Sequence, residues 1–489
     1  MKNRRRRFVF VLFLFSVFVP LFVPVKVSAV TSLLRPPCSA DKESLQTLFE
    51  DGSVHLNDKI FQQVKKDKKL CLTLKDCLRI SLVRNRDINL ANESLIQADA
   101  DVTRALSAVR PFLGAEVSYT RLDEALAFGL GPISMTFMEQ DLYKAGIVLR
   151  QPVFMGGRLN AARKAAGYSR DAREKEKLSV KDEIVFQVTR AYHAAQVAES
   201  FFRVALEGVS LLEVHEHDVA IFVREGVSPK LDLLRTQTEL ANARKELNGA
   251  ENAFDLGLSA LKNLLVVDLE EPVVLMDHLR HIQRPLFDLS ILTTRALSKR
   301  YELYALRSQI SAVEQGLKAA KGELLPAVAL EGRYEYIKGD FRELDGGNHW
   351  TVGIGAQVPL WDWGNIRPKI RKAGSQVNEI KLQLQKAEES ICLEVRRAYL
   401  DFGKAEKNFI AAESAMTTAK EAYRLAKAGY REGVGTNTDV LEGRTALSRA
   451  EANHALALFE CNVAFAALQR AVGAPVIEQL ENEKEISAR

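Results

Sequence analysis

A long internal duplication limits the folds open to this chain more than any other feature of its sequence. Pro152 matches Pro359 at an offset of 207 residues (359 − 152 = 207), and Gly157 meets Gly364 at the same offset. The offset holds as far as the matching segments "REGVSPKLDLL" and "REGVGTNTDVL". Two long copies indicate a tandem duplication, because a solenoid needs three or more short repeats.

Upstream of these motifs the offset changes, which places a longer loop in the first copy. Pro111 matches Pro326 (326 − 111 = 215), and Tyr119 matches Tyr334. In each copy the residue pattern predicts a helix, two strands and two long helices, in that order. We expect the first repeat to cover residues 72–275 and the second 276–475, with a tail at 476–489.

The helical segments of the two repeats are predicted from hydrophobic periodicity and helix-forming residues. The first helix is expected over 73–110, with Thr73 as its N-cap, and its counterpart over 288–324. No proline interrupts residues 159–223, and a helix of that length extends for about 100 Å at 1.5 Å per residue. A shorter helix over 231–265 returns after "REGVSP", and the second repeat follows the same plan over 370–472.

Two segments of each repeat alternate apolar and polar residues with the period of a β-strand. They cover residues 113–120 and 143–150 in the first copy, and 328–336 and 350–358 in the second. We expect strands of about ten residues, the length that spans an outer membrane with lipid on one face and water on the other. A half-buried sheet in a soluble domain shows the same alternation, but four matching strands favour the membrane.

The N-terminus predicts export from the cytoplasm. "MKNRRRR" precedes an apolar run and the small-residue site "VSA", so residues 1–29 are interpreted as a signal peptide. An uncleaved membrane anchor is the alternative, which Pro20 and Pro24 disfavour. Residues 30–71 are then expected to form an N-terminal periplasmic segment.

Four strands are too few for a closed membrane barrel, which needs at least about eight. Open edges in lipid leave unpaired backbone groups, each of which costs several kcal/mol. Long amphipathic helices likewise need neighbours to cover their apolar faces. The chain is therefore expected to oligomerise, unless its sheet lies outside a membrane.

The junctions "QPVFMGGR" and "VPLWDWGN" are alike, since each leads from a strand through a proline, an aromatic residue and a glycine into a basic helix. We expect the prolines to end the strands, the aromatic residues to lie at the lipid interface and the glycines to turn the chain. Only the second junction has an extra tryptophan and is expected to be strongly anchored. The junction residues are Pro152, Phe154, Gly157, Pro359, Trp361, Trp363 and Gly364.

These motifs, with "GVGTNTDVL" at the second helical turn, resemble those of the TolC family of outer-membrane efflux and secretion channels, and the resemblance covers Leu72 to Gly473. It implies a mainly α fold with membrane β-strands: a trimer whose 12-stranded β-barrel continues into a long periplasmic α-helical barrel (3 × 4 = 12 strands). It also implies an exit duct in the cell outer membrane for a tripartite efflux pump or type I secretion system. The implied partners are a periplasmic adaptor protein and an inner-membrane pump or ABC exporter.

The resemblance assigns a gate to the periplasmic helical turns. Asp439 and Glu442, one helical turn apart, match the family's pore-constricting carboxylates. Asp232 is the first-repeat equivalent of Asp439, but Arg235 replaces the second carboxylate. Without the resemblance, a solvated helix face or an interaction with the helix dipole is the simpler interpretation of these acidic residues.

Further gate residues also follow from the resemblance. Tyr430 matches a tyrosine that latches the closed tip, whereas Gly435 stands where the family has a latching arginine. The two turns match the surfaces on which periplasmic adaptors dock. The turn residues are Gly226, Val227, Ser228, Gly433, Val434 and Gly435.

Other kinds of function have little support in the sequence. No nucleophile elbow, phosphate-binding loop or triad spacing occurs, so we expect no enzymatic activity and no cofactor. A metal site is not expected, because "HEH" from His215 and "HLRH" from His278 lack a supporting ligand set. Mixed charges along the helices argue against nucleic acid as a partner. Five scattered cysteines are too sparse for a disulfide framework, although Cys71 and Cys77 could pair, and a lipid anchor at Cys38 is not expected.

Two alternatives to a channel remain. A periplasmic adaptor also uses a helical hairpin, but it would carry a single hairpin flanked by small β-domains. A coiled-coil scaffold would have no pore. The sequence predicts no cargo, since in such systems the pump selects the substrate.

Overall fold

The structure, a computed structural model, describes residues 65–66, 69–130, 133–281, 288–340 and 345–473. The predicted signal peptide, Cys38 and the tail at 476–489 lie outside these residues.

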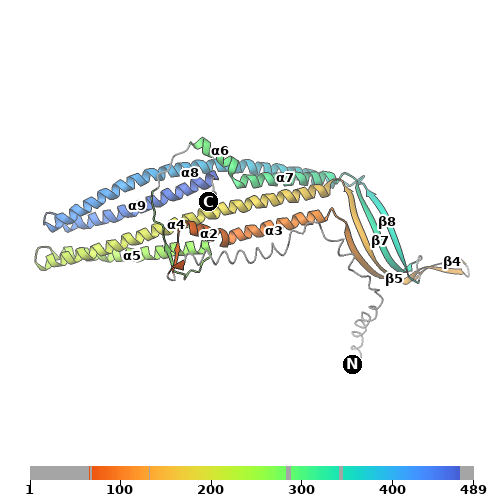
Figure 1. The fold of residues 1–489 in the computed structure, drawn as a ribbon, viewed down its shortest axis with the longest axis horizontal. Coiled ribbons are helices and arrows are strands. Elements are labelled where there is room, and N and C mark those ends of the chain that lie inside the picture. Colours follow the sequence, from red (N-terminus) through yellow and green to blue (C-terminus); the bar gives the residue numbers. More distant parts are fainter. Residues whose placement is uncertain (1–64, 67–68, 131–132, 282–287, 341–344, 474–489) are drawn as a thin grey trace, which may run out of the picture. The chain divides into compact units, whose positions relative to one another are not determined.

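The helices occur in pairs of nearly equal length, as a duplication requires (Figure 1). The paired helices have 11 and 11, 22 and 22, 67 and 66, and 36 and 36 residues. The long helices therefore have the lengths that the sequence predicts. The pairs are α2 (Leu74–Arg84) with α6 (Leu289–Lys299), α3 (Arg86–Ser107) with α7 (Tyr301–Gly322), α4 (Arg158–Arg224) with α8 (Ile366–Arg431), and α5 (Lys230–Leu265) with α9 (Asn437–Val472).

A break divides the first helix of each repeat, so the continuous helices predicted over 73–110 and 288–324 are wrong. The backbone becomes extended at Asn85 (φ −61°, ψ 133°) and at Arg300 (φ −65°, ψ 126°). Asn85 ends α2 and caps α3, because its side-chain oxygen accepts a hydrogen bond from the Asp87 N–H at 2.9 Å. The two breaks are equivalent positions, since they lie 215 residues apart (300 − 85 = 215).

The strands form an antiparallel sheet in the order β3-β5-β7-β8 at one end of the long helices (Figure 1). β3 (Phe112–Arg121) and β8 (Gly347–Gln357) form its edges. In the centre, β5 (Ile133–Met155) pairs with β7 (Ala327–Asp340), and this pairing joins the two repeats.

Two features of the sheet differ from the prediction. β5 has 23 residues rather than about ten, and it continues through Pro152 to Met155, still paired with β7. Its pairing with β3 ends at Arg150, so Pro152 occupies an edge position, where a residue without an N–H is tolerated. The beginning of β5 pairs with β4 (Leu126–Leu130), in a region predicted to be a loop. Pro359, by contrast, lies two residues after β8 ends, as predicted.

The two faces of the sheet have opposite chemistry, which confirms the predicted alternation. One face carries a ladder of ion pairs across β3, β5 and β7, with N–O distances of 3.2–3.4 Å. The other face exposes large apolar side chains on every strand. The ladder contains Glu116, Arg150, Glu331 and Arg333, and the apolar face includes Val117, Ile147, Tyr334 and Ile354.

A second, smaller sheet fixes the ends of the first repeat and was not predicted. β1 (Lys65–Lys66) pairs with β2 (Lys69–Leu72), and β2 pairs in parallel with β6 (Val273–Leu275). After β2, Thr73 begins α2 with the predicted N-cap, in which its hydroxyl and the Asp76 side chain form a capping box.

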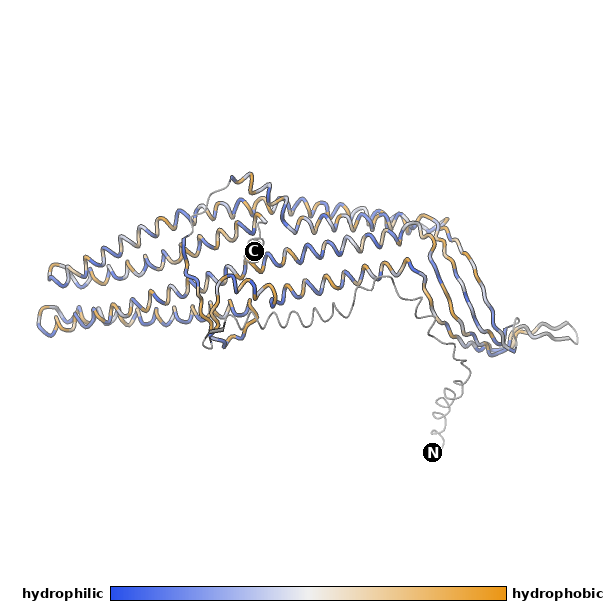
Figure 2. The backbone as a smooth tube through the Cα atoms, in the orientation of Figure 1, coloured by the Kyte–Doolittle hydropathy of each residue, from blue (hydrophilic) through white to orange (hydrophobic). Residues whose placement is uncertain are grey.

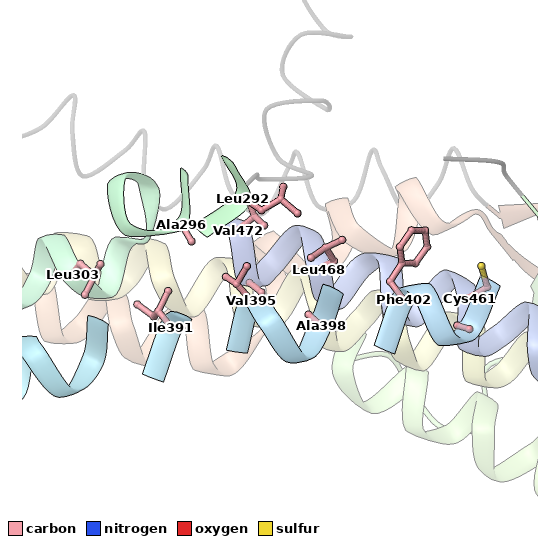
Figure 3. Packing of buried hydrophobic residues seen from close by; sticks show 12 residues of the cluster. Leu292, Ala296, Leu303, Ile391, Val395, Ala398, Phe402, Cys461, Leu468 and Val472 are labelled. Carbon is pink, nitrogen blue, oxygen red and sulfur yellow. The ribbon is translucent and has the colours of Figure 1, made fainter. Parts of the chain in front are cut away.

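A hydrophobic core lies where α6 and α7 pack on α8 and α9 (Figure 3). Apolar residues are spread along every helix rather than gathered in one block (Figure 2). The buried side chains of this core are Leu292, Ala296, Leu303, Ile391, Val395, Ala398, Phe402, Ala405, Cys461, Leu468, Ala471 and Val472.

Candidate functional site

The two helical turns farthest from the strands have the same backbone geometry (Figure 1). Gly226 and Gly433 both have φ of 76°, which glycine adopts without strain. In each turn the following valine N–H donates to a carbonyl five residues earlier, at 2.8 Å for Val227 and 3.0 Å for Val434. The valine side chains are 75% and 86% exposed. Both turns therefore present an apolar tip.

The carboxylate of Asp439 caps the first turn of α9. It accepts hydrogen bonds from the Thr436 hydroxyl at 2.7 Å and the Thr436 N–H at 2.8 Å. These two bonds hold the pKa of Asp439 below its ordinary value, so this carboxylate stays ionised. Glu442 follows one helical turn later, and both residues are exposed. The capping interaction and a pore-facing charge are compatible, because a capping oxygen remains in contact with solvent.

Asp232 does not share the environment of Asp439, although the two positions are equivalent in the repeat. Its side chain is 19% exposed and accepts a hydrogen bond from the Ser228 hydroxyl at 3.0 Å. Arg235 is exposed and lies with Glu442 in a groove between α5 and α9, about 790 Å³ in volume. Asp232 therefore stabilises the turn between α4 and α5 through Ser228. The exposed acidic residues near the tip, Asp439 and Glu442, both lie on α9.

Asn437 joins the two helical hairpins through buried polar contacts that the sequence did not reveal. Its side-chain oxygen lies 2.8 Å from His215 Nε2, and its amide donates to the carbonyl of Asp232 and the hydroxyl of Thr236, both at 3.2 Å. Burial lowers the pKa of His215 below its ordinary value, so the neutral imidazole forms this contact.

Tyr430 also lies between the hairpins. Its ring centroid is 5.3 Å from that of His215 and 5.7 Å from that of Phe222, both on α4. The next residue, Arg431, forms an ion pair with Asp218 of α4 at 3.2 Å. Tyr430 thus holds the α8–α9 hairpin against the α4–α5 hairpin, and its role as a latch of the closed tip stays a prediction.

Gly435 is closely packed, which explains why a larger residue is absent there. A Cβ at this position would lie 3.0 Å from the backbone nitrogen of Tyr430 and 3.1 Å from the carbonyl carbon of Gly429. The turn would have to move to admit an arginine.

The strand-to-helix junctions turn at glycines, as predicted. Gly157 and Gly364 have φ of 78° and 83°. At the second junction the ring centroids of Trp361 and Trp363 lie 5.7 Å apart on the surface. Asp362, between them, accepts hydrogen bonds from the Gly364 N–H in the turn, at 3.0 Å, and from the Ile366 N–H at the start of α8, at 2.6 Å.

The first junction depends on a glycine that sequence reasoning missed. Gly156, with φ of 62°, packs its backbone directly on that of Gly322 at the end of α7. A Cβ on Gly156 would overlap the carbonyl oxygen of Gly322, whereas a Cβ on Gly157 would meet no atom within 4 Å. The close contact fixes the end of β5 to the end of α7.

A cluster of charged side chains ties four helices together near the helix break at Arg300. Arg300 pairs with Glu394 at 3.1 Å, and Arg470 pairs with Glu394 at 3.1 Å and Glu183 at 2.6 Å. The cluster also contains Glu302 and Asp182, so its carboxylates outnumber its two arginines. Burial, followed by the negative charge of Glu302, raises the pKa of Asp182 from 3.8 to about 6.

Asp182→Asn is expected to flatten the dependence of stability on pH. In the folded protein Asp182 holds its proton up to about pH 6, whereas in the unfolded chain it loses the proton near pH 3.8. The contribution of this proton to the free energy of unfolding is therefore fully present below about pH 4 and is lost as pH rises through 6. Asparagine mimics the protonated form, and we expect the variant to gain about 1–2 kcal/mol over the wild type between pH 4 and pH 7.5, after allowance for solvent at the carboxylate. Urea unfolding at both pH values measures the difference. Asp401→Asn, at an exposed position on α8, should show no such gain.

Comparison with known proteins agrees with this arrangement. The outer membrane efflux protein family matches residues 78–265 and 292–474, one stretch in each repeat. Protein CyaE of Bordetella pertussis is 27% identical over 330 residues, which cover 67% of this chain and 70% of CyaE.

Solved structures share the fold. The outer-membrane channel OprN is 20% identical with a TM-score of 0.72, covering 82% of this chain and 90% of OprN. The outer membrane channel CmeC of Campylobacter jejuni is 17% identical, also with a TM-score of 0.72, covering 84% of this chain and 88% of CmeC. The paired strands, paired hairpins and matching segments lead to one conclusion: the chain belongs to the outer membrane efflux protein family of TolC-like channels.

Proposed function

We propose that three copies of this chain close one 12-stranded barrel in the outer membrane and form the exit duct of a tripartite efflux pump or a type I secretion system. The observation that carries this proposal is the incomplete sheet. Its apolar face is exposed, and among the described residues no strand pairs with the outer edge of β3 or β8. Backbone edges in lipid must be paired, and joining β8 of one copy to β3 of the next pairs them.

The long hairpins complete the duct on the periplasmic side. A helix of 67 residues at 1.5 Å per residue extends for about 100 Å, several times the thickness of a bilayer core. Three α8–α9 hairpins would bring three copies of Asp439 and Glu442 together at the tip. The resulting rings of carboxylates gate the duct and select cations.

The exposed turns supply the partner surface. Val227 and Val434 project from two turns of equal geometry, a repeated apolar tip suited to a periplasmic adaptor that bridges to an inner-membrane pump or ABC exporter. The duct itself is passive and catalyses no reaction. A periplasmic adaptor fits the chain poorly, because two hairpins and a membrane-type sheet are present instead of one hairpin with small β-domains.

Electrical recording tests the duct and its gate together. Detergent-purified protein should have the mass of three chains and should form cation-selective channels in planar bilayers that La³⁺ blocks from the periplasmic side. Asp439→Ala with Glu442→Ala should weaken the block about tenfold or more, because each contact with a charged group is worth about 1.5–3 kcal/mol.

Glu460→Ala is the matched control. Glu460 is exposed on α9, 18 residues (460 − 442 = 18) and thus five full turns from Glu442 on the same face, but away from the tip. Its loss should change the block much less. Protein that gives no conductance would refute the duct, and a block that the double variant leaves unchanged would refute only the gate.

A further inference from the structure

Three side chains with metal-binding atoms meet beside the α8–α9 hairpin. Nε2 of His281 lies 3.0 Å from one carboxylate oxygen of Glu406, and Sγ of Cys461 lies 3.1 Å from the other. The three ligand atoms all lie within 4.8 Å of one another. They come from three segments of the chain: the connection after β6, α8 and α9.

The imidazole is held in place by packing. The His281 ring stacks on Phe409 of α8, with centroids 4.2 Å apart and an angle of 11° between the planes. Leu279, two residues earlier, packs against the buried cluster of Phe409, Ala457 and Leu458. His281 and Glu406 are each about one-fifth exposed, so an ion in solution can reach them.

The thiol lies deeper than its partners. Cys461 is buried in the core that α6, α7, α8 and α9 share (Figure 3). The described cysteines Cys71, Cys77, Cys392 and Cys461 form no disulfide. As a thiol that donates to Glu406, Cys461 can supply a thiolate ligand to a metal ion.

We propose that His281, Glu406 and Cys461 bind a divalent transition-metal ion of the zinc class. Imidazole, carboxylate and thiolate are all zinc ligands, and at their usual bond lengths the ligand atoms around a tetrahedral ion lie about 3.5 Å apart. The present separations need only small adjustments of the side chains. Three protein ligands leave the fourth position for water.

When the ion binds, the site loses one proton. The thiol already donates a hydrogen bond to Glu406, and the ion replaces the thiol proton, which passes to solvent as the sulfur–metal bond forms. In the structure Nε2 of His281 contacts the Glu406 carboxylate, which only accepts, so Nε2 carries the imidazole proton there. On metal binding this proton moves to Nδ1 by exchange with solvent, and the neutral imidazole binds the ion through Nε2. The occupied site fastens the connection between the repeats to the second hairpin, a role that goes beyond the proposed duct and does not depend on it.

This proposal departs from the expectation, drawn from the sequence alone, that the chain has no metal site. The sequence around His281 does not reveal the other two ligands of this site. Glu406 and Cys461 lie 125 and 180 residues farther along the chain (406 − 281 = 125; 461 − 281 = 180). The fold brings them to His281.

Titration of the reduced, detergent-solubilised full chain with Co²⁺ tests the site, because a cobalt–thiolate bond gives a charge-transfer band that oxygen and nitrogen ligands do not. We expect one Co²⁺ per chain with this band, displacement by one Zn²⁺ per chain, and a higher unfolding temperature with Zn²⁺. Cys461→Ser should abolish the band. His281→Ala should weaken Zn²⁺ binding by at least about tenfold, since even outer-shell partners contribute that much.

Two matched variants serve as controls. His278→Ala removes an exposed histidine three residues from His281, and Cys392→Ser removes a half-buried cysteine of α8. Both should keep the band and the affinity. Absence of a thiolate band in the wild type would overturn the proposal, as would a band that survives Cys461→Ser. If Cys461→Ser does not fold, wild-type affinity in His281→Ala would overturn it equally.

Discussion

Replacing Arg300 with alanine is expected to lower the free energy of unfolding by about 2–3 kcal/mol, less than the roughly 3–5 kcal/mol for a fully buried ion pair, because its two carboxylate partners are about one-third exposed. The Arg300 side chain is 7% exposed and bonds to Glu302 and Glu394. It also donates to the carbonyl oxygens of Arg470 and Ala471, at 3.3 and 3.2 Å, at the C-terminal end of α9. Alanine would take one donor from each of two carboxylates and from the end of α9, and Glu394 would keep only its pair with Arg470. The midpoint of urea unfolding measures the loss.

Arg307→Ala is the control for this prediction. Arg307 lies in α7, seven residues (307 − 300 = 7) after the break at Arg300, and pairs with Glu388 at 3.4 Å, but both side chains are about 40% exposed. Exposed pairs contribute up to about 1 kcal/mol. A loss at Arg300 no larger than the loss at Arg307 would contradict the role of Arg300 in joining α7, α8 and α9.

Gly156→Ala is the second change with a large expected effect, about 3 kcal/mol of stability. The new methyl group would be forced against the backbone of Gly322, which adds the cost of overpacking to that of a left-handed conformation. Because α7 and β5 meet at this contact, the end of the sheet must shift to relieve the overlap. Thermal unfolding of the purified protein measures the change.

Gly157→Ala isolates the contact from the backbone conformation. Its φ of 78° resembles the 62° of Gly156, but its Cβ would meet open space. We expect a loss of about 1–2 kcal/mol, the conformational cost alone. Equal losses at the two glycines would show that the packing on Gly322 contributes nothing.

The elements predicted correctly are those with signals along the chain itself. Helical periodicity without proline predicts α4 and the part of α8 after Pro368, and the capping box at Thr73 predicts the start of α2. The internal duplication adds a second, independent copy of each signal. The family and the order of the helices and strands therefore follow from the sequence, because the signals for them lie in residues that are close together along the chain.

Apart from the helix break at Asn85, which has a local cap, the features that were missed depend on a distant neighbour. Pro152 remains in β5 because β7 continues beside it after β3 has ended. His215 and Asn437 meet although they are 222 positions apart, and nothing near either residue marks the contact. The importance of Gly156 likewise depends on Gly322, a glycine at the end of another helix. Such contacts become visible only once the chain is folded.

The β5–β7 pairing determines the symmetry that the proposed trimer would have. β8 is the repeat equivalent of β5, at an offset of 207, and β3 is the equivalent of β7, at an offset of 215 (354 − 147 = 207; 334 − 119 = 215). Within one chain, Ile147 pairs with Tyr334. The same register between neighbouring chains would pair Ile354 with Tyr119. A trimer joined in this way has approximate sixfold symmetry, in which each boundary between chains copies a boundary already present inside every chain.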